Sequence, residues 1–140
     1  MPPTASRWGY GAFGAVNNNT IIGNQWDVQC PNFPNCDPSW IQWVATAVLV
    51  YVAGDVSINH NQISGAGTDI GVAAYYSGVV NVMNNVVERT LPAEDVVDDY
   101  GIGVDFYGNA GKSKVVNNTF SGWTDAYLGE DLSNNNVVSP

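Results

Sequence analysis

The chain has 140 residues, which is enough for one domain with a real core and too few for two. It carries thirteen Asp and Glu against four Lys and Arg, for a net charge of −9. This balance argues against nucleic acid as a partner, because clustered cations are needed to bind it. No apolar run is long enough to span a membrane, and the first residues show no apolar segment of a signal peptide.

A short pattern recurs along the chain: an apolar residue, two variable positions, an asparagine, one further position and a second apolar residue. Its copies are Val16-Asn19-Ile21, Ile58-Asn61-Ile63, Val82-Asn85-Val87, Val115-Asn118-Phe120 and the weaker Ser133-Asn136-Val138. A recurring supersecondary unit indicates a coil stacked on copies of itself. We therefore expect one strand per copy, with its asparagine in a structural ladder along one corner of the stack.

A second type of strand lies between these copies, with apolar residues at every other position and a closing glycine. Its members are Val48-Val50-Val52, Val72-Ala74-Tyr76 and Ile102-Val104-Phe106, closed by Gly54, Gly78 and Gly108. Such alternation predicts strands. Aligning Gly71 with Gly101 places Tyr76 on Phe106, both facing inward. The predicted core is Val16, Ile21, Val48, Val50, Val56, Ile58, Ile63, Val72, Ala74, Val82, Val87, Ile102, Val104, Val115 and Phe120.

Two insertions interrupt the coils, at residues 24–44 and 88–99, and both fall at the same edge of the predicted stack. The first contains Cys30 and Cys36, whose spacing across a Pro-rich turn favours a disulfide and an oxidising compartment. Two reduced thiols are the alternative. Asp37-Pro38 and Pro92 are each suited to start a short helical turn. Insertions gathered on one face of a solenoid often form its binding face.

The repeat resembles the pectin-lyase-like, right-handed parallel β-helix proteins of the carbohydrate-binding and sugar-hydrolase superfamily. The resemblance is carried by residues 58–65, by residues 115–122 and by the Gly-Ile-Gly-Val run at 101–104. It implies an all-β, single-stranded parallel β-helix of about five coils, forming one domain over residues 1–140 with a solenoid at 14–138. The motif is specific for the fold and says little about function, because this fold hosts many activities.

Four aspartates are the catalytic candidates: Asp69, Asp98, Asp99 and Asp125. The runs Thr68-Asp69 and Asp98-Asp99 resemble the acidic signatures of polygalacturonases, inverting glycosidases that use two carboxyl groups. The Gly-His-Gly and Arg-Ile-Lys segments of those enzymes are absent here. Solvated turn residues are the plainer interpretation. Lyase or epimerase chemistry would need cations beside these acids, and only Arg89, Lys112 and Lys114 are available outside the N-terminus.

No motif requires a cofactor, although a calcium ion is one alternative, since it is held by several carboxylate oxygens. The acidic residues close together in sequence are Glu94, Asp95, Asp98, Asp99 and Asp105. They lack the spacing of a calcium loop, and a solvated acidic segment is the other interpretation.

Aromatic residues suggest sugar binding, because flat rings offer an apolar face. The ligand-binding candidates are Trp26, Trp40, Trp43, Tyr51 and Tyr75; alternatively, the tryptophans cap the stack. The leading hypothesis is a secreted, extracellular or periplasmic, non-catalytic module that recognises a polysaccharide or glycan. A glycosidase using the Asp residues and a structural solenoid, or a fragment of a longer one, are the alternatives. We also expect self-association through the open C-terminal coil.

Overall fold

The computed structural model describes residues 11–23, 46–65, 69–90 and 101–140. These residues form strands and their connections, with no helix among them. The strands are β1 (Gly14–Asn17), β2 (Thr20–Gly23), β3 (Thr46–Tyr51), β4 (Val56–Asn59), β5 (Gln62–Gly65), β6 (Ile70–Tyr75), β7 (Val80–Met83), β8 (Val86–Arg89), β9 (Ile102–Tyr107), β10 (Lys114–Val116), β11 (Thr119–Ser121), β12 (Asp125–Leu128), β13 (Leu132–Asn134) and β14 (Val137–Ser139).

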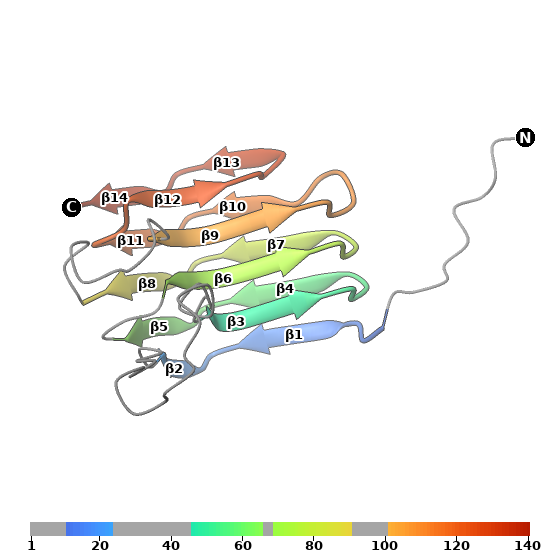
Figure 1. Cartoon of the computed structure of the whole chain (residues 1–140), viewed down its shortest axis with the longest axis horizontal. Coiled ribbons are helices and arrows are strands. Elements are labelled where there is room, and N and C mark those ends of the chain that lie inside the picture. Colours follow the sequence, from blue (N-terminus) through green and yellow to red (C-terminus); the bar gives the residue numbers. More distant parts are fainter. Residues whose placement is uncertain (1–10, 24–45, 66–68, 91–100) are drawn as a thin grey trace, which may run out of the picture.

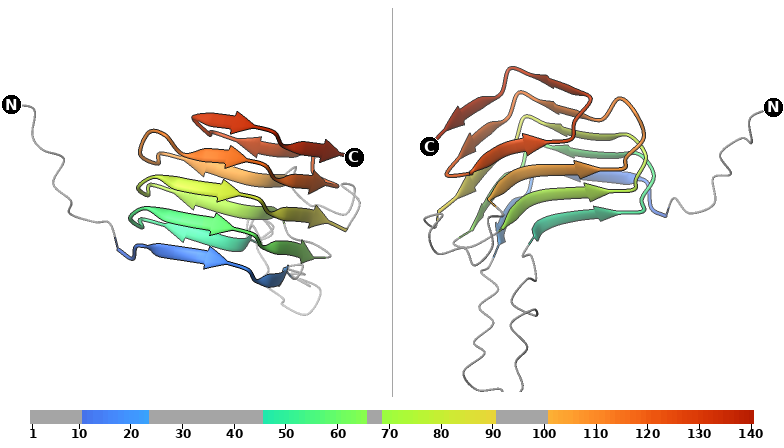
Figure 2. Two further views of the ribbon diagram at one scale, coloured as in Figure 1. Left: turned by 180° about the vertical axis from the view of Figure 1, so that it is seen from behind. Right: turned by 45° about the horizontal axis from the view of Figure 1, so that its top comes forward.

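The strands pair in three parallel sheets. Sheet A has the order β1-β4-β7-β10-β13, sheet B β2-β5-β8-β11-β14, and sheet C β3-β6-β9-β12. Each successive stretch of chain adds one strand to each sheet, and we call such a set a rung. Figures 1 and 2 show the rungs stacked from β1 and β2 at one end to β12, β13 and β14 at the other. The prediction of an all-β, parallel, repetitive architecture is confirmed, and the arrangement is compatible with a parallel β-helix.

Columns of aliphatic side chains fill the interior, because the apolar residues at alternate strand positions stack in register from rung to rung. In sheet A, Val16, Ile58, Val82 and Val115 form one such column. Most of the predicted core is buried; Val16, Ile21 and Val56 are partly buried and pack against it. Ile102 is only half-buried, contrary to prediction, because it lies at the first position of β9 and pairs with the exposed Asp125.

The asparagine-bearing segments differ from the prediction: each forms two strands, not one. The chain bends between sheet A and sheet B at the residue just before each ladder asparagine. That residue has positive φ in every copy, at Asn18, His60, Asn84, Asn117 and Asn135. A left-handed residue ends the pleat, and Asn and His adopt this conformation more readily than most residues. The apolar residues on either side of the ladder therefore belong to two sheets that meet at a corner.

The register between β6 and β9 is shifted by two residues from the predicted one. Val72 pairs with Val104 and Ala74 with Phe106, so Gly71 lies opposite Gly103 instead of Gly101. A shift of two keeps every side chain on its own face of the sheet, so the apolar pattern fits both alignments equally well. Tyr76 is also not inward, because it adopts φ 51° just beyond the end of β6 and its side chain is exposed.

The structure describes only a few residues of the two predicted insertions. Glu88 and Arg89, assigned to the second insertion from the sequence, are in fact the last two residues of β8. Cys30 and Cys36 lie outside the described residues, as do both predicted helical turns, so the disulfide stays a prediction. Within the ranges described above, there is no helix long and apolar enough to cross a membrane.

Candidate functional site

Three exposed tyrosines line one side of sheet C and form the candidate site. We call Tyr51, Tyr76 and Tyr107 the tyrosine row; their exposed fractions are 61, 51 and 63%. The ring centroids of Tyr51 and Tyr76 lie 6.2 Å apart, and those of Tyr76 and Tyr107 lie 5.4 Å apart. Both pairs are edge-on, a favoured arrangement for aromatic rings. The row thus spans three successive rungs while its rings remain open to solvent.

The tyrosine row is held in place by the strand register and by one bend of the chain. Tyr51 ends β3, Tyr107 ends β9, and both are aligned with Tyr75 at the end of β6. Side chains at this position point away from the core, because the neighbouring residues Val50 and Phe106 point into it. Tyr76 follows Tyr75, and its left-handed backbone carries its ring to a place between the other two.

Tyr75 contributes a polar group beside the row. Its hydroxyl donates a hydrogen bond to Oδ2 of Asp105, over 2.7 Å and between neighbouring rungs. A hydrogen bond to a charged acceptor is stronger than one between neutral groups and holds both side chains in place. The outer face of sheet C therefore combines open aromatic rings with an oriented carboxylate.

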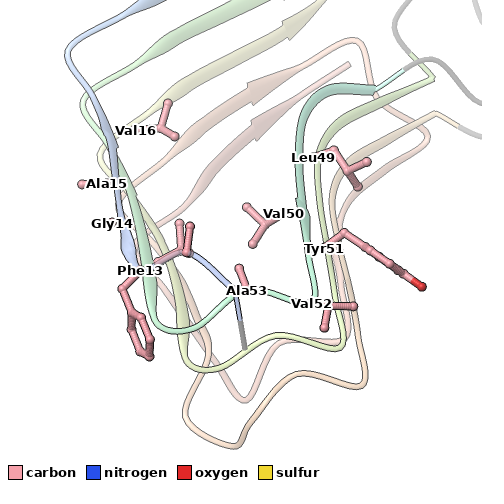
Figure 3. Close-up of a pocket in the computed structure, with 12 residues that line it drawn as sticks. Phe13, Gly14, Ala15, Val16, Leu49, Val50, Tyr51, Val52 and Ala53 are labelled. Atoms are coloured by element: carbon pink, nitrogen blue, oxygen red, sulfur yellow. The ribbon is translucent and has the colours of Figure 1, made fainter. Parts of the chain in front are cut away.

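Two exposed leucines extend this surface. Leu49 lies two residues before Tyr51 on β3, and Leu128 lies on β12 in register with Asp105. Figure 3 shows the side chains of Leu49 and Tyr51 pointing away from the interior, whereas Val50 and Val16 point into it. Leu49 thus extends the exposed apolar surface before Tyr51 on β3, whereas the same register position is the buried Ala73 on β6 and Asp105 on β9.

Sequence reasoning identified Tyr51 and Tyr75 and missed Tyr76 and Tyr107. The signal was present, since each of Tyr51, Tyr75 and Tyr107 is the last residue of its strand before a glycine-containing turn. The register anchored on Gly101 hid it, because that alignment left Tyr107 without a tyrosine partner.

The candidate catalytic aspartates do not form a column where the structure describes them. Asp69 precedes Ile70, which pairs with Ile102, and Ile102 in turn pairs with Asp125. Asp125 is therefore one residue out of register with Asp69, two rungs away. Consecutive residues of a strand face opposite sides. Asp98 and Asp99 lie outside the described residues.

Most of the predicted calcium ligands also lie outside the described residues. Glu94, Asp95, Asp98 and Asp99 lie in residues 91–100, and the described member, Asp105, accepts the bond from Tyr75. Among the residues that the structure describes, no group of three or more His, Cys, Asp or Glu side chains could hold a metal ion. Trp26, Trp40 and Trp43 also lie outside the described ranges.

The three cations considered for uronate chemistry lie in different settings. Arg89 is buried at the end of β8, and within the described part of the chain its Nε and Nη1 have no hydrogen-bond partner. Gly65 on β5 pairs with Arg89, and Gly122 directly follows β11 on the other side, where an added Cβ would meet the Arg89 backbone. Lys112 is exposed in a turn and Lys114 is half-buried on β10.

A cavity of about 340 Å³ opens between β1 and β3, at the end of the stack where the described strands begin. It is lined by residues 11–16, residues 49–53 and Val56, which include no His, Cys, Asp, Glu, Lys or Arg. Figure 3 shows Val16, Val50 and Ala53 around this space. The lining is apolar and lacks the convergent polar groups that acid–base chemistry needs.

The asparagine ladder is a continuous hydrogen-bonded column in the structure. The Oδ1 atoms of Asn61, Asn85, Asn118 and Asn136 each accept bonds from the backbone N–H and the Nδ2 of the asparagine one rung before. With both amide groups used in this way, the inner asparagines have structural partners and no group directed at a ligand.

Comparison with known proteins gave no relative: no protein-family model, no curated protein and no solved structure matches this chain.

Proposed function

We propose that the chain is a right-handed parallel β-helix of the pectin-lyase-like type that binds a neutral glycan, without catalysis, along the outer face of sheet C. The observation that carries the proposal is the tyrosine row, with Tyr51, Tyr76 and Tyr107 exposed on successive rungs. Large exposed aromatic surfaces on a rigid sheet usually serve recognition.

The spacing of the row suits an extended sugar chain. Tyr51 and Tyr107 end strands two rungs apart, and two steps of a parallel sheet amount to roughly 9.6 Å. In an extended β-1,4-linked chain, alternate sugar rings present the same face at a similar interval. Tyr51 and Tyr107 would each stack on one of these rings, while the Tyr75–Asp105 pair would accept or donate bonds to hydroxyls between them.

Charge favours a neutral ligand over an anionic one. The chain carries a net charge of −9, which repels polyuronates as it repels nucleic acid. The proposed setting is extracellular or periplasmic, where such polysaccharides occur and where a Cys30–Cys36 disulfide would persist. The register separates Asp69 from Asp125 and thus gives no support to the hydrolase alternative.

Calorimetric titration with a neutral β-1,4-linked hexasaccharide and with oligogalacturonate tests the proposal. We expect binding of the neutral sugar, and a loss of affinity of about tenfold or more in Tyr107→Ala, equivalent to roughly 1.4 kcal/mol. Phe13→Ala is the matched control, because Phe13 is equally exposed but lies off sheet C. Equal affinities of Tyr107→Ala and the wild type would overturn the assignment of the row. A parallel Trp40→Ala variant tests the first insertion.

A further inference from the structure

The asparagine ladder has two chemically different ends. At the β1–β2 end, Asn19 donates both its backbone N–H and its Nδ2 to Asn61, and among the described residues its Oδ1 accepts no bond. At the other end, Oδ1 of Asn136 accepts from Asn118 and its Nδ2 donates to the carbonyl of Val115. No acceptor in the described part of the chain meets the Asn136 backbone N–H. One end thus offers an acceptor and the other a donor.

The strands at the two ends would also pair in register. Parallel pairing repeats the same columns at every rung. Continuing these columns past β13 and β14 places Ser133 opposite Val16 and Val138 opposite Ile21. Val138 is 55% exposed although its column partner Phe120 is buried. A further rung would therefore bury apolar surface that the last rung leaves in water.

The outermost described strands of sheets A and B lack the residues that normally block edge pairing. Strands at a sheet edge are usually protected by charged residues, proline or a bulge. The sequences of β1, β2, β13 and β14 are Gly-Ala-Val-Asn, Thr-Ile-Ile-Gly, Leu-Ser-Asn and Val-Val-Ser, and none contains a charged residue or proline. Among the described residues, no strand pairs with the outer edges of β1, β2, β13 and β14, so these edges can accept a parallel partner with the same register.

We propose that the chain associates with a second copy of itself head to tail, with β13 and β14 of one copy pairing with β1 and β2 of the next. The Asn136 N–H and Nδ2 of the first copy would donate to Oδ1 of Asn19 in the second and so continue the ladder. Because the two surfaces differ, the contact is heterologous and can extend into a filament. The net charge of −9 opposes it at long range, so added salt should strengthen it.

Sedimentation of the 140-residue chain from low micromolar to submillimolar concentration tests this inference with two end-specific variants. We call the β1–β2 edge the head and the β13–β14 edge the tail. Val138→Lys disables the tail surface and Ile21→Lys disables the head surface. Each variant alone should be monomeric, with association weakened more than about tenfold. Mixed in equal amounts, they should form a dimer and nothing larger, because only one head and one tail remain intact. Val86→Lys is the control, since Val86 is exposed on sheet B in the middle of the stack; it should associate like the wild type.

Hydrogen exchange supplies a readout that needs no folded variant. Amides of β2 and β14 should gain protection as the wild-type concentration rises, whereas those of β8 should not change. A monomeric wild type at every concentration and salt level would overturn the inference. So would dimerisation of Val138→Lys alone, because this would show that two heads pair with each other.

Discussion

The backbone N–H and the side-chain Nδ2 of Asn85 both donate to Oδ1 of Asn118, over 2.9 and 3.0 Å. Asn85 repeats the role of Asn118 one rung earlier, since its own Oδ1 accepts the same pair of bonds from Asn61. Every inner asparagine thus ties the rung before it to the rung after it. These bonds are buried, and a broken one leaves partners that water cannot reach.

Replacing Asn85 by leucine should therefore destabilise the whole stack. The change leaves the carbonyl of Ile58 and the amide groups of Asn61 without their partner, at a cost of about 1–3 kcal/mol. Thermal unfolding followed by circular dichroism should show a melting temperature lower by several degrees.

Asn19→Leu is the matched control for that variant. Asn19 is exposed, and it donates along the ladder without accepting from another described residue. The same substitution there should cost clearly less. Equal melting temperatures for Asn85→Leu and the wild type would contradict a structural role of the ladder.

The bend before each ladder asparagine can be tested separately from the ladder, because the bend depends on backbone conformation and not on side-chain hydrogen bonds. Asn117 has φ 56° and an exposed side chain. A β-branched residue is strongly disfavoured in this region, whereas glycine adopts it readily. Asn117→Val should lower the free energy of unfolding by about 1–2 kcal/mol, and Asn117→Gly should leave it nearly unchanged. Urea unfolding of the two variants measures the difference; equal losses would point to the side chain instead.

The disulfide between Cys30 and Cys36 stays a prediction from sequence alone. The turn between the two cysteines can bring their sulfurs together. We therefore expect no titratable thiol in denatured protein that has not been reduced. Thiol counting before and after reduction gives the answer directly. Two titratable thiols in air-exposed protein would contradict it.

The repeat was predicted correctly from the sequence because the same residue type, asparagine, recurs in each copy together with the apolar pattern. Only a residue with both an amide donor and a carbonyl acceptor can continue the column from Asn61 to Asn118, so asparagine recurs at one place in every rung. The bend beside it was missed, although the bending residue is asparagine in four of the five copies and His60 in the other. Asparagine is tolerated in the left-handed region but does not require it, so the Asn-Asn pairs alone did not predict a corner.

The candidate site was predicted less completely, for two physical reasons. The alternation of β9 fits two registers, so Tyr107 was not aligned with Tyr75. Tyr76 was predicted to face inward, because its left-handed turn is not encoded by a glycine. The fourth strand of sheet C was also missed: β12 (Asp125–Leu128) contains only Ala126 and Tyr127 as partly buried residues, too short a pattern to recognise.

The register of β6 on β9 can be tested at the glycines it brings together. A Cβ at Gly71 would lie 2.6 Å from the carbonyl oxygen of Gly103 and 2.7 Å from Cγ1 of the buried Val87. Backbone on an adjacent strand cannot move aside without breaking the ladder of hydrogen bonds. Gly71→Ala should therefore destabilise the protein by about 1–3 kcal/mol, as overpacking does.

Gly14→Ala is the control for this variant, since Gly14 also lies in a strand but a Cβ there would meet nothing within 4 Å. It should leave stability unchanged or raise it by about 0.4–1 kcal/mol, because alanine restricts the unfolded chain. Melting temperatures of the two variants are compared with that of the wild type. If Gly71 faced Gly101, as the sequence pattern first indicated, its replacement would be governed by different neighbours. A Gly71→Ala protein as stable as Gly14→Ala would therefore exclude the close approach to Gly103 on which the alignment of Tyr75 with Tyr107 depends.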